Sequence, residues 1–179
     1  MRCCKHLSCG PRGPPGPAGQ VGPAIAFLVQ GTQQFEGGLV FHQLLYDTVL
    51  TNVGDRFSLE TSTFNPSEKG LYQLSFTANY NILVSPAVFG LYNGRFERVT
   101  YCLGAGTDIG SCSFSVVINT WDNPGPFYIE MITASDINIQ SYFSGYFIRK
   151  LDSTEQTTYV PTRNDFIEKI IEGIKLDKK

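Results

Sequence analysis

The 179-residue sequence predicts an all-β protein, an antiparallel two-sheet jelly-roll sandwich that assembles as a homotrimer. Between residues 25 and 151, runs rich in β-branched and aromatic residues alternate with turn signals about every ten residues, which predicts the sandwich. No helical period appears in this span, which argues against alternating strands and helices. Glycine occupies every third position from 10 to 22. This rhythm predicts three chains, because only glycine fits at the axis of a collagen triple helix.

Composition divides the chain into five segments. They are a Cys-rich N-terminal segment (1–9), a collagen-like repeat (10–24), a jelly-roll head (25–151), a polar linker (152–163) and an amphipathic helical tail (164–179). At a rise of roughly 3.1 Å per residue, the five collagen triplets form a rod of only about 45 Å. Because so short a rod is too little to hold three chains together, we expect the head to set the trimer.

The predicted strands of the head are bounded by Gly, Asn and Pro turn residues. They lie at 25–30, 38–50, 55–61, 70–84, 87–103, 111–121, 126–134 and 137–151. The residues on either side of Asn93-Gly94 are expected to pair as a hairpin, since this dipeptide suits a two-residue type I′ turn.

The last segment changes to helical spacing. Its apolar residues fall on one face of the predicted helix: Phe166, Ile167, Ile170, Ile171 and Ile174. Thr162 or Asn164 can cap its first turn. A helix of this length is marginal alone. Three copies could therefore bundle together, one could dock against another structure, or the segment could remain a frayed tail.

Charge and motifs exclude several functions. The net charge of −2 gives no basic stripe for nucleic acid, and no run of 18 apolar residues could span a membrane. His42 lies in a predicted strand without any nucleophile motif, so we predict no catalytic residue and no enzyme. Polar residues follow Met1 where a signal peptide would be apolar, which predicts synthesis in the cytosol or a sequence that starts inside a longer protein.

The five cysteines form two groups. Cys3, Cys4 and Cys9 are expected to form inter-chain disulfides beside the collagen-like repeat. Reduced thiols and an inter-chain metal site are alternatives, and no metal site is firmly predicted. Cys102 and Cys112 flank a short loop. They can pair across a hairpin or stay reduced in the core, and we slightly favour the reduced state.

The stretch from 46 to 76, YDTVLTNVGDRFSLETSTFNPSEKGLYQLSF, resembles the signature of the globular head of complement component 1q. The matching positions are Tyr46, Asn52, Phe57, Phe64, Gly70, Tyr72 and Phe76. Tyr46 stands where Phe is usual, and Leu74 replaces another Phe. Residues 24–27 and 141–148 are similar to the first and last strands of that family, so the resemblance covers roughly residues 24–151. A collagen segment upstream is the common layout of the family.

The resemblance implies that these signature residues belong to the core. Such heads, like the related tumour necrosis factor fold, trimerise through one inner sheet. The strands near 24–30, 70–81, 111–120 and 141–150 would form that sheet. Trimer contacts are then expected among Phe27, Phe76, Phe114, Tyr142 and Phe147. Some members bind calcium through apical loops, and the acidic candidates here are Asp108, Asp122 and Asp136, although no motif supports a cofactor.

These features predict a non-enzymatic trimeric structural and attachment module. Its collagen-stalked head would be exposed on a particle surface after cytosolic synthesis, as in a viral or phage spike or fibre or a spore coat filament, and would bind a protein or glycan receptor. The alternative is a secreted complement-like or adiponectin-like recognition or signalling protein. An apolar leader upstream would favour this alternative.

Overall fold

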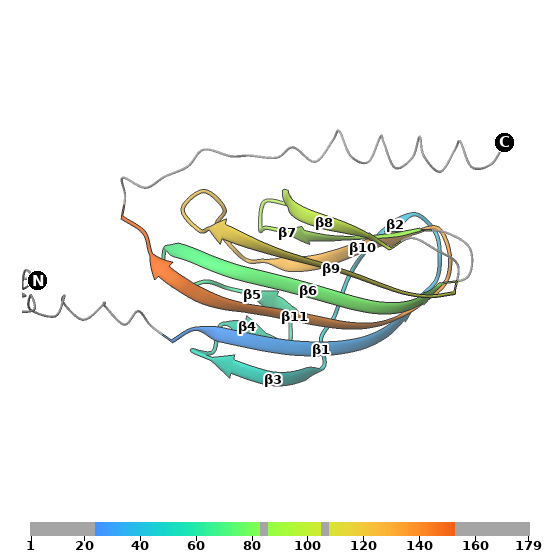
Figure 1. Cartoon of the computed structure of the whole chain (residues 1–179), viewed down its shortest axis with the longest axis horizontal. Helices are drawn as coiled ribbons and strands as arrows, with labels where there is room; N and C mark the ends of the chain where they lie inside the picture. Colours follow the sequence, from blue (N-terminus) through green and yellow to red (C-terminus); the bar gives the residue numbers. More distant parts are fainter. Residues whose placement is uncertain (1–23, 83–85, 105–107, 153–179) are drawn as a thin grey trace, which may run out of the picture.

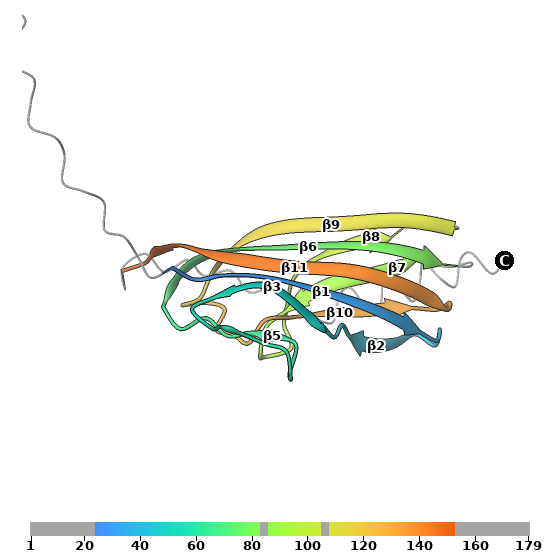
Figure 2. The same ribbon diagram turned by 90° about the horizontal axis from the view of Figure 1, so that it is seen from below.

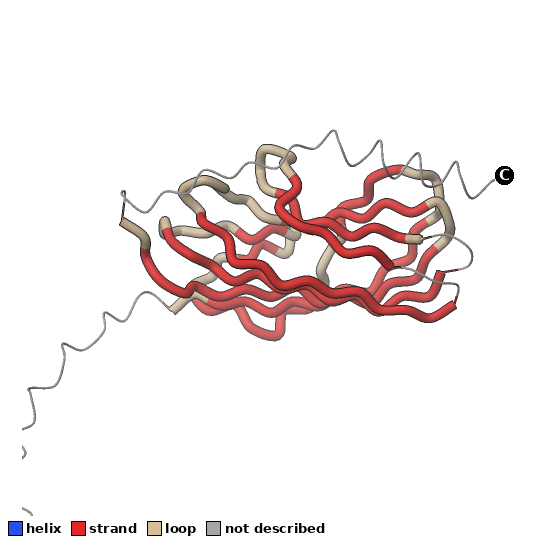
Figure 3. The backbone as a smooth tube through the Cα atoms, turned by 45° about the horizontal axis from the view of Figure 1, so that its top comes forward, coloured by secondary structure: helices blue, strands red, loops and turns tan. Residues whose placement is uncertain are grey.

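The computed structural model describes residues 24–82, 86–104 and 108–152 (Figure 1). These residues form eleven β-strands and no helix, and strands make up most of the tube in Figure 3. The predicted all-β antiparallel sandwich is therefore confirmed. The Cys-rich segment, the collagen-like repeat up to Pro23, the linker after Asp152 and the predicted helical tail lie outside the described residues.

Five antiparallel strands form the larger sheet, in the order β3-β1-β11-β6-β9. They are β3 (Thr48–Val53), β1 (Ala26–Phe35), β11 (Ile137–Lys150), β6 (Gly70–Ile82) and β9 (Asp108–Asn119). Figure 2 shows them side by side, from β9 at one edge to β3 at the other. Four of these strands are the ones that the resemblance assigned to one sheet, and β3 is an additional edge strand.

Four antiparallel strands form the second sheet, in the order β2-β10-β7-β8. They are β2 (Val40–Gln43), β10 (Tyr128–Thr133), β7 (Ala87–Tyr92) and β8 (Arg98–Gly104). A small hairpin joins β4 (Phe57–Ser58) to β5 (Thr63–Phe64). The chain crosses repeatedly between the two sheets, and β1 begins at the same end of the sandwich at which β11 ends (Figure 1).

The core fills the space between the sheets with aromatic and aliphatic side chains. Phe27 lies at its centre, stacked on Phe64 at a ring-centroid distance of 4.7 Å and edge-on to Phe143 at 5.0 Å. Phe89, Leu91, Ile129 and Met131 of the second sheet are fully buried in the same cluster. The two-residue alternation of each strand therefore sends one set of side chains into a shared core.

Two local features differ from the sequence prediction. The predicted strand 38–50 breaks into β2 and β3, because Gln33 accepts a hydrogen bond from the Leu45 amide at 3.0 Å and donates one to the Leu45 carbonyl. The hairpin at Asn93-Gly94 forms between β7 and β8, but its loop spans 93–97. The Asn93 side chain accepts bonds from the amides of Arg95 and Glu97, which stabilises this longer loop instead of a type I′ turn.

Candidate functional site: the outer face of the five-stranded sheet

The outer face of the five-stranded sheet is almost free of charge. The only charged residues in its five strands are Asp108, Arg149 and Lys150, and all three lie at strand ends. Five adjacent strands without a charge in their interiors form a continuous uncharged surface, which is the property expected of the centre of a protein interface.

Side chains on this face change character along the strands, as the strand register shows. At the end where β1 finishes, neighbouring rows carry amides: Gln34, Asn138, Asn81, Gln140 and Asn79. The middle rows carry hydroxyl groups on β6, β9 and β11, including Ser75, Ser115 and Ser144. The opposite end is apolar, with Val53, Val117 and Tyr146 each about half exposed.

A hydrogen-bonded network fixes the polar side chains between the middle rows and the apolar end. The Tyr146 hydroxyl donates to Gln73 at 2.9 Å, and the Gln73 amide donates to Ser115 at 2.7 Å. The Ser115 hydroxyl also lies 2.8 Å from that of Ser75. Because these groups satisfy one another, they can be covered by another protein surface with little loss of hydrogen bonding.

Most aromatic residues expected at the trimer contact face the other way. Phe27 and Phe76 are 3% and 1% exposed and lie in the core. Phe114 packs on Phe76 with ring centroids 5.3 Å apart, and Phe147 packs on Tyr72 at 5.1 Å. The expectation for these four is corrected, because their side chains point between the sheets. Only Tyr142 of the five lies on the outer face, in register with Thr77 and Gln30.

A pattern in the sequence of β9 indicates which of its side chains point to the core and which lie on the outer face. In β9, serines 111, 113 and 115 alternate with Cys112, Phe114 and Val116. The exposed serines lie outward, and the alternate residues point to the core. Strict alternation of small polar and apolar residues indicates which side of a half-buried strand is covered by its own domain. Aromatic residues alone do not identify an interface in this fold.

The structure places most signature residues in the core. Tyr46, Phe57, Phe64, Tyr72 and Phe76 are all less than 5% exposed. Burial of the phenol raises the pKa of Tyr46 above its ordinary value.

Two signature residues have other roles. The Asn52 side chain accepts bonds from the amides of Arg56 and Phe57 and donates to the Phe57 carbonyl, which fixes the turn after β3. Gly70 allows the backbone of β11 to approach closely, since a Cβ there would meet the Arg149 carbonyl and lie 2.7 Å from the Phe147 ring.

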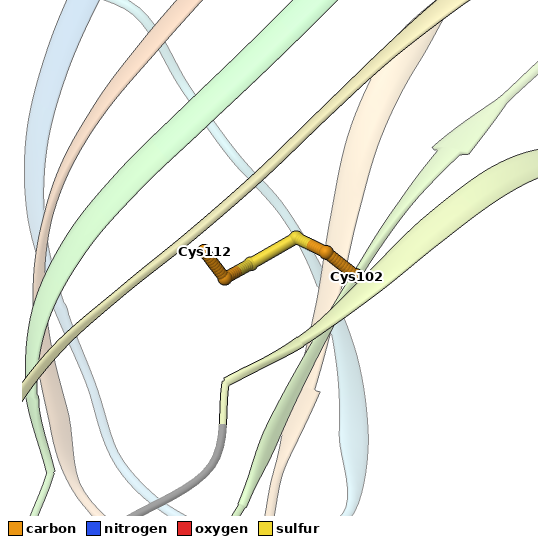
Figure 4. The surroundings of a disulfide bond; sticks show 2 residues. All are labelled: Cys102 and Cys112. Atoms are coloured by element: carbon orange, nitrogen blue, oxygen red, sulfur yellow. A yellow bond between two sulfur atoms is a disulfide. The ribbon is translucent and has the colours of Figure 1, made fainter.

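Cys102 and Cys112 form a disulfide bond, with an S–S distance of 2.04 Å (Figure 4). The slight preference for reduced thiols was wrong. Cys102 lies on β8, an edge of the four-stranded sheet, and Cys112 lies on β9, an edge of the five-stranded sheet. The disulfide therefore links the two sheets along one side of the sandwich instead of closing a hairpin within one sheet. Cys3, Cys4 and Cys9 lie outside the described residues.

The acidic candidates for calcium do not form a cluster. Asp122 accepts a hydrogen bond from the Asn119 amide at 2.9 Å, and Asp136 accepts one from the Gly37 backbone at 3.0 Å. Asp108 begins β9, and its side chain is not described. Within the described ranges, no three His, Cys, Asp or Glu side chains are grouped to hold a metal ion. No helix in those ranges is long and apolar enough to cross a membrane.

Comparison with known proteins identifies the family. The model of the C1q domain matches residues 26–148, which cover all eleven strands except the last two residues of β11. The chain belongs to the C1q domain family. The resemblance found in the signature residues is confirmed. A search of curated protein sequences gave no significant match.

Solved structures support the same fold. The globular domain of zebrafish complement 1qA matches with a TM-score of 0.55 and 14% identity, over 72% of this chain and 99% of that chain. The Eiger TNF from S. frugiperda matches with a TM-score of 0.55 and 12% identity, over 76% of this chain and 99% of that chain. At these identities the similarity establishes the jelly-roll fold shared by the C1q and tumour necrosis factor proteins.

Proposed function

We propose that this protein is a non-enzymatic homotrimeric attachment module, in which three jelly-roll heads on a short collagen-like stalk present identical binding surfaces. The heads pack through the outer faces of their five-stranded sheets. Three copies of one binding surface give avidity for a repeated protein or glycan receptor. Zebrafish complement 1qA and the Eiger TNF support the assignment of the fold, and the trimer and the receptor are the proposed steps beyond it.

The uncharged outer face of the five-stranded sheet is the main observation that supports the proposed trimer. Its apolar end includes Val53, Val117 and Tyr146, which are 45–53% exposed. Neighbouring rows contribute hydrogen-bonded polar groups without bringing a charge into a contact. Burial of apolar area stabilises association by about 25 cal/mol per Å², and the strand interiors of this face bring no charge into the contact. The same end of the sandwich carries the start of β1, which directly follows the collagen-like repeat.

The intersheet disulfide supports a location exposed to an oxidising space, because disulfides persist there and are rare in the cytosol. We propose that this space is the outside of a particle, such as a virion or spore, on which the head is exposed after cytosolic synthesis. A secreted recognition or signalling protein is the second candidate, and the disulfide is equally consistent with it.

The trimer is tested by light scattering of the full chain under reducing conditions. We expect a mass of three times the 19.8 kDa chain. Ser115→Lys places a charge in the hydrogen-bonded network of the face and should yield monomers. Ser67→Lys makes the same change on an exposed loop before β6 and should remain trimeric. A wild-type monomer would refute the proposal, and so would a Ser115→Lys protein that folds and still forms trimers.

A further inference from the structure

The outer face of the four-stranded sheet is the second large face of the sandwich that no described strand covers, and it is apolar. The strand register places Phe41, Ile132, Val88 and Leu103 in one row across all four strands. The next row on this face contains Tyr101, and the row after it contains Tyr92 and Tyr128. An apolar row that crosses a whole sheet is unusual on the solvent side of a two-layer sandwich, where polar residues normally alternate with core residues.

Several of these outward side chains are buried. Val88, Tyr92, Tyr128 and Ile132 are 5–8% exposed, yet none of them belongs to the hydrophobic core cluster between the sheets. No described strand lies over this face. Tyr92 lies over Gly90, since a Cβ on Gly90 would be 2.8 Å from the Tyr92 ring. Tyr92 also stacks on Tyr128 at a centroid distance of 6.0 Å. The result is a flat aromatic surface suited to an apolar partner.

Leu103 and Tyr101 extend this surface toward the edge. They are 56% and 41% exposed, and Arg98 lies over the Tyr101 ring at 4.7 Å. Glu130 is in register with Tyr101 across Gly90. A partner for this face therefore needs an apolar stripe with both positive and negative charges on its flanks.

The C-terminal segment of the same chain has this composition. Its apolar stripe of Phe166, Ile167, Ile170, Ile171 and Ile174 is flanked by Glu168, Lys169, Glu172 and Lys175. A helix of the 16 residues from 164 to 179 would be about 24 Å long. The six-residue strands beneath it span about 20 Å. Such a helix is marginal in water alone, so its stability requires burial of the stripe.

The connection is long enough to reach this face. Strand β11 ends at Lys150, and the Leu151 amide is bonded to the Lys69 carbonyl at the end of the sandwich. The 12 residues from 152 to 163 can extend about 40 Å, whereas packed sheets lie about 10 Å apart. The other outer face carries hydroxyl and amide groups over most of its length and offers a less apolar surface to the stripe.

We infer that residues 164–179 form a helix that packs its isoleucine stripe on the outer face of the four-stranded sheet of the same protomer. The helix acts as a third layer and leaves the five-stranded face open for other subunits. The inference is independent of the proposed trimer, because the two surfaces lie on opposite sides of the sandwich.

The test is limited trypsin digestion of the full chain, with cleavage after Lys169 and Lys175 followed by mass spectrometry. A synthetic peptide of residues 152–179 gives the rate for the free segment. We expect cleavage in the intact protein to be at least about tenfold slower, which corresponds to roughly 1.4 kcal/mol of docking free energy. Leu103→Asp and Ile170→Asp should each bring the rate close to that of the peptide.

Val117→Asp is the matched control. Val117 is 53% exposed on the outer face of the other sheet, so the change is similar to that at Leu103 on the opposite side. Its tail should stay protected even where light scattering shows monomers. Ile170→Asp lies outside the C1q domain and leaves the fold of the head intact. This variant should also bind more of the dye ANS than wild type, because the aromatic face becomes accessible.

Two results would overturn the inference. Cleavage of the wild-type tail at the peptide rate would show that the segment is free for another component or frayed. Protection that survives Leu103→Asp but disappears in monomeric Val117→Asp would show that three tails bundle together.

Discussion

Gly145 offers a sharp test of the packing between the sheets. It lies on β11, opposite Phe27 of β1 and Leu74 of β6, and all three side-chain directions point into the core. A Cβ at position 145 would be 2.6 Å from the Phe27 ring and closer still to the Leu74 side chain. Gly145→Ala therefore forces one methyl group into a filled space.

Two opposing effects determine how much Gly145→Ala changes the free energy of unfolding. Replacement of glycine by alanine reduces the entropy of the unfolded chain and stabilises a protein by about 0.4–1 kcal/mol where the backbone allows it. Gly145 does not have a left-handed φ, so this gain applies. Overpacking of a core costs about 1–3 kcal/mol. The steric effect is larger, and we expect Gly145→Ala to be net destabilising by about 1–2 kcal/mol.

The second variant, Leu74→Ala, should lower the free energy of unfolding by about 2–5 kcal/mol, because Leu74 is fully buried. The double variant should lose at least about 0.5 kcal/mol less than the sum of the two single losses, since the new methyl group enters the space that Leu74 vacates. Urea unfolding at one fixed protein concentration measures all three variants, because stability of an oligomer depends on concentration.

Gly38→Ala is the control for this series. The nearest heavy atom to a Cβ there is 3.7 Å away, so the change should stay within about 0.5 kcal/mol of wild type. Strict additivity in the double variant, or a Gly145→Ala protein as stable as wild type, would refute the packing described around Phe27.

Three further perturbations test the core, the disulfide and the signature turn. The folded-state pKa of Tyr46 is raised above the ordinary 10.0, so its contribution to stability is complete below pH 10 and is lost as the pH rises further. Urea unfolding from pH 10 to 11.5 should show wild type losing about 1.4 kcal/mol per pH unit more than Tyr46→Phe; equal slopes would contradict the burial. Replacement of Cys102 and Cys112 by serine should lower stability by about 3 kcal/mol, because the disulfide closes a loop with a separation of 10 residues. Thermal unfolding without reductant measures this loss, and an unchanged midpoint would indicate that the thiols are not paired. Asn52→Ala removes three bonds to backbone groups and should cost about 1–3 kcal/mol in the same assay. Asn65→Ala, which removes a single bond to the Thr63 hydroxyl, should cost less than Asn52→Ala.

The sequence determined the fold class and the contents of the core. Short runs in which apolar and polar residues alternate indicate β-strands, and a strand can satisfy its backbone hydrogen-bonding groups only by pairing with other strands. The prediction of a sandwich follows from these two facts. The spacing from Tyr46 to Phe76 was specific enough to assign the family before any strand was paired. Both results depend on local pattern, which the sequence contains in full.

The tertiary structure decided which face of each strand meets the other sheet. Phe27, Phe76, Phe114 and Phe147 all have the chemistry of interface residues, and the paired strands show that they point inward, which the sequence indicates only for Phe114 through the alternating serines of β9. Register also brings Cys102 of one sheet to within 6.1 Å of Cys112 of the other, measured between Cα atoms. A shift of one residue would exchange the two faces of a strand, and the choice is made by contacts between residues far apart in the chain.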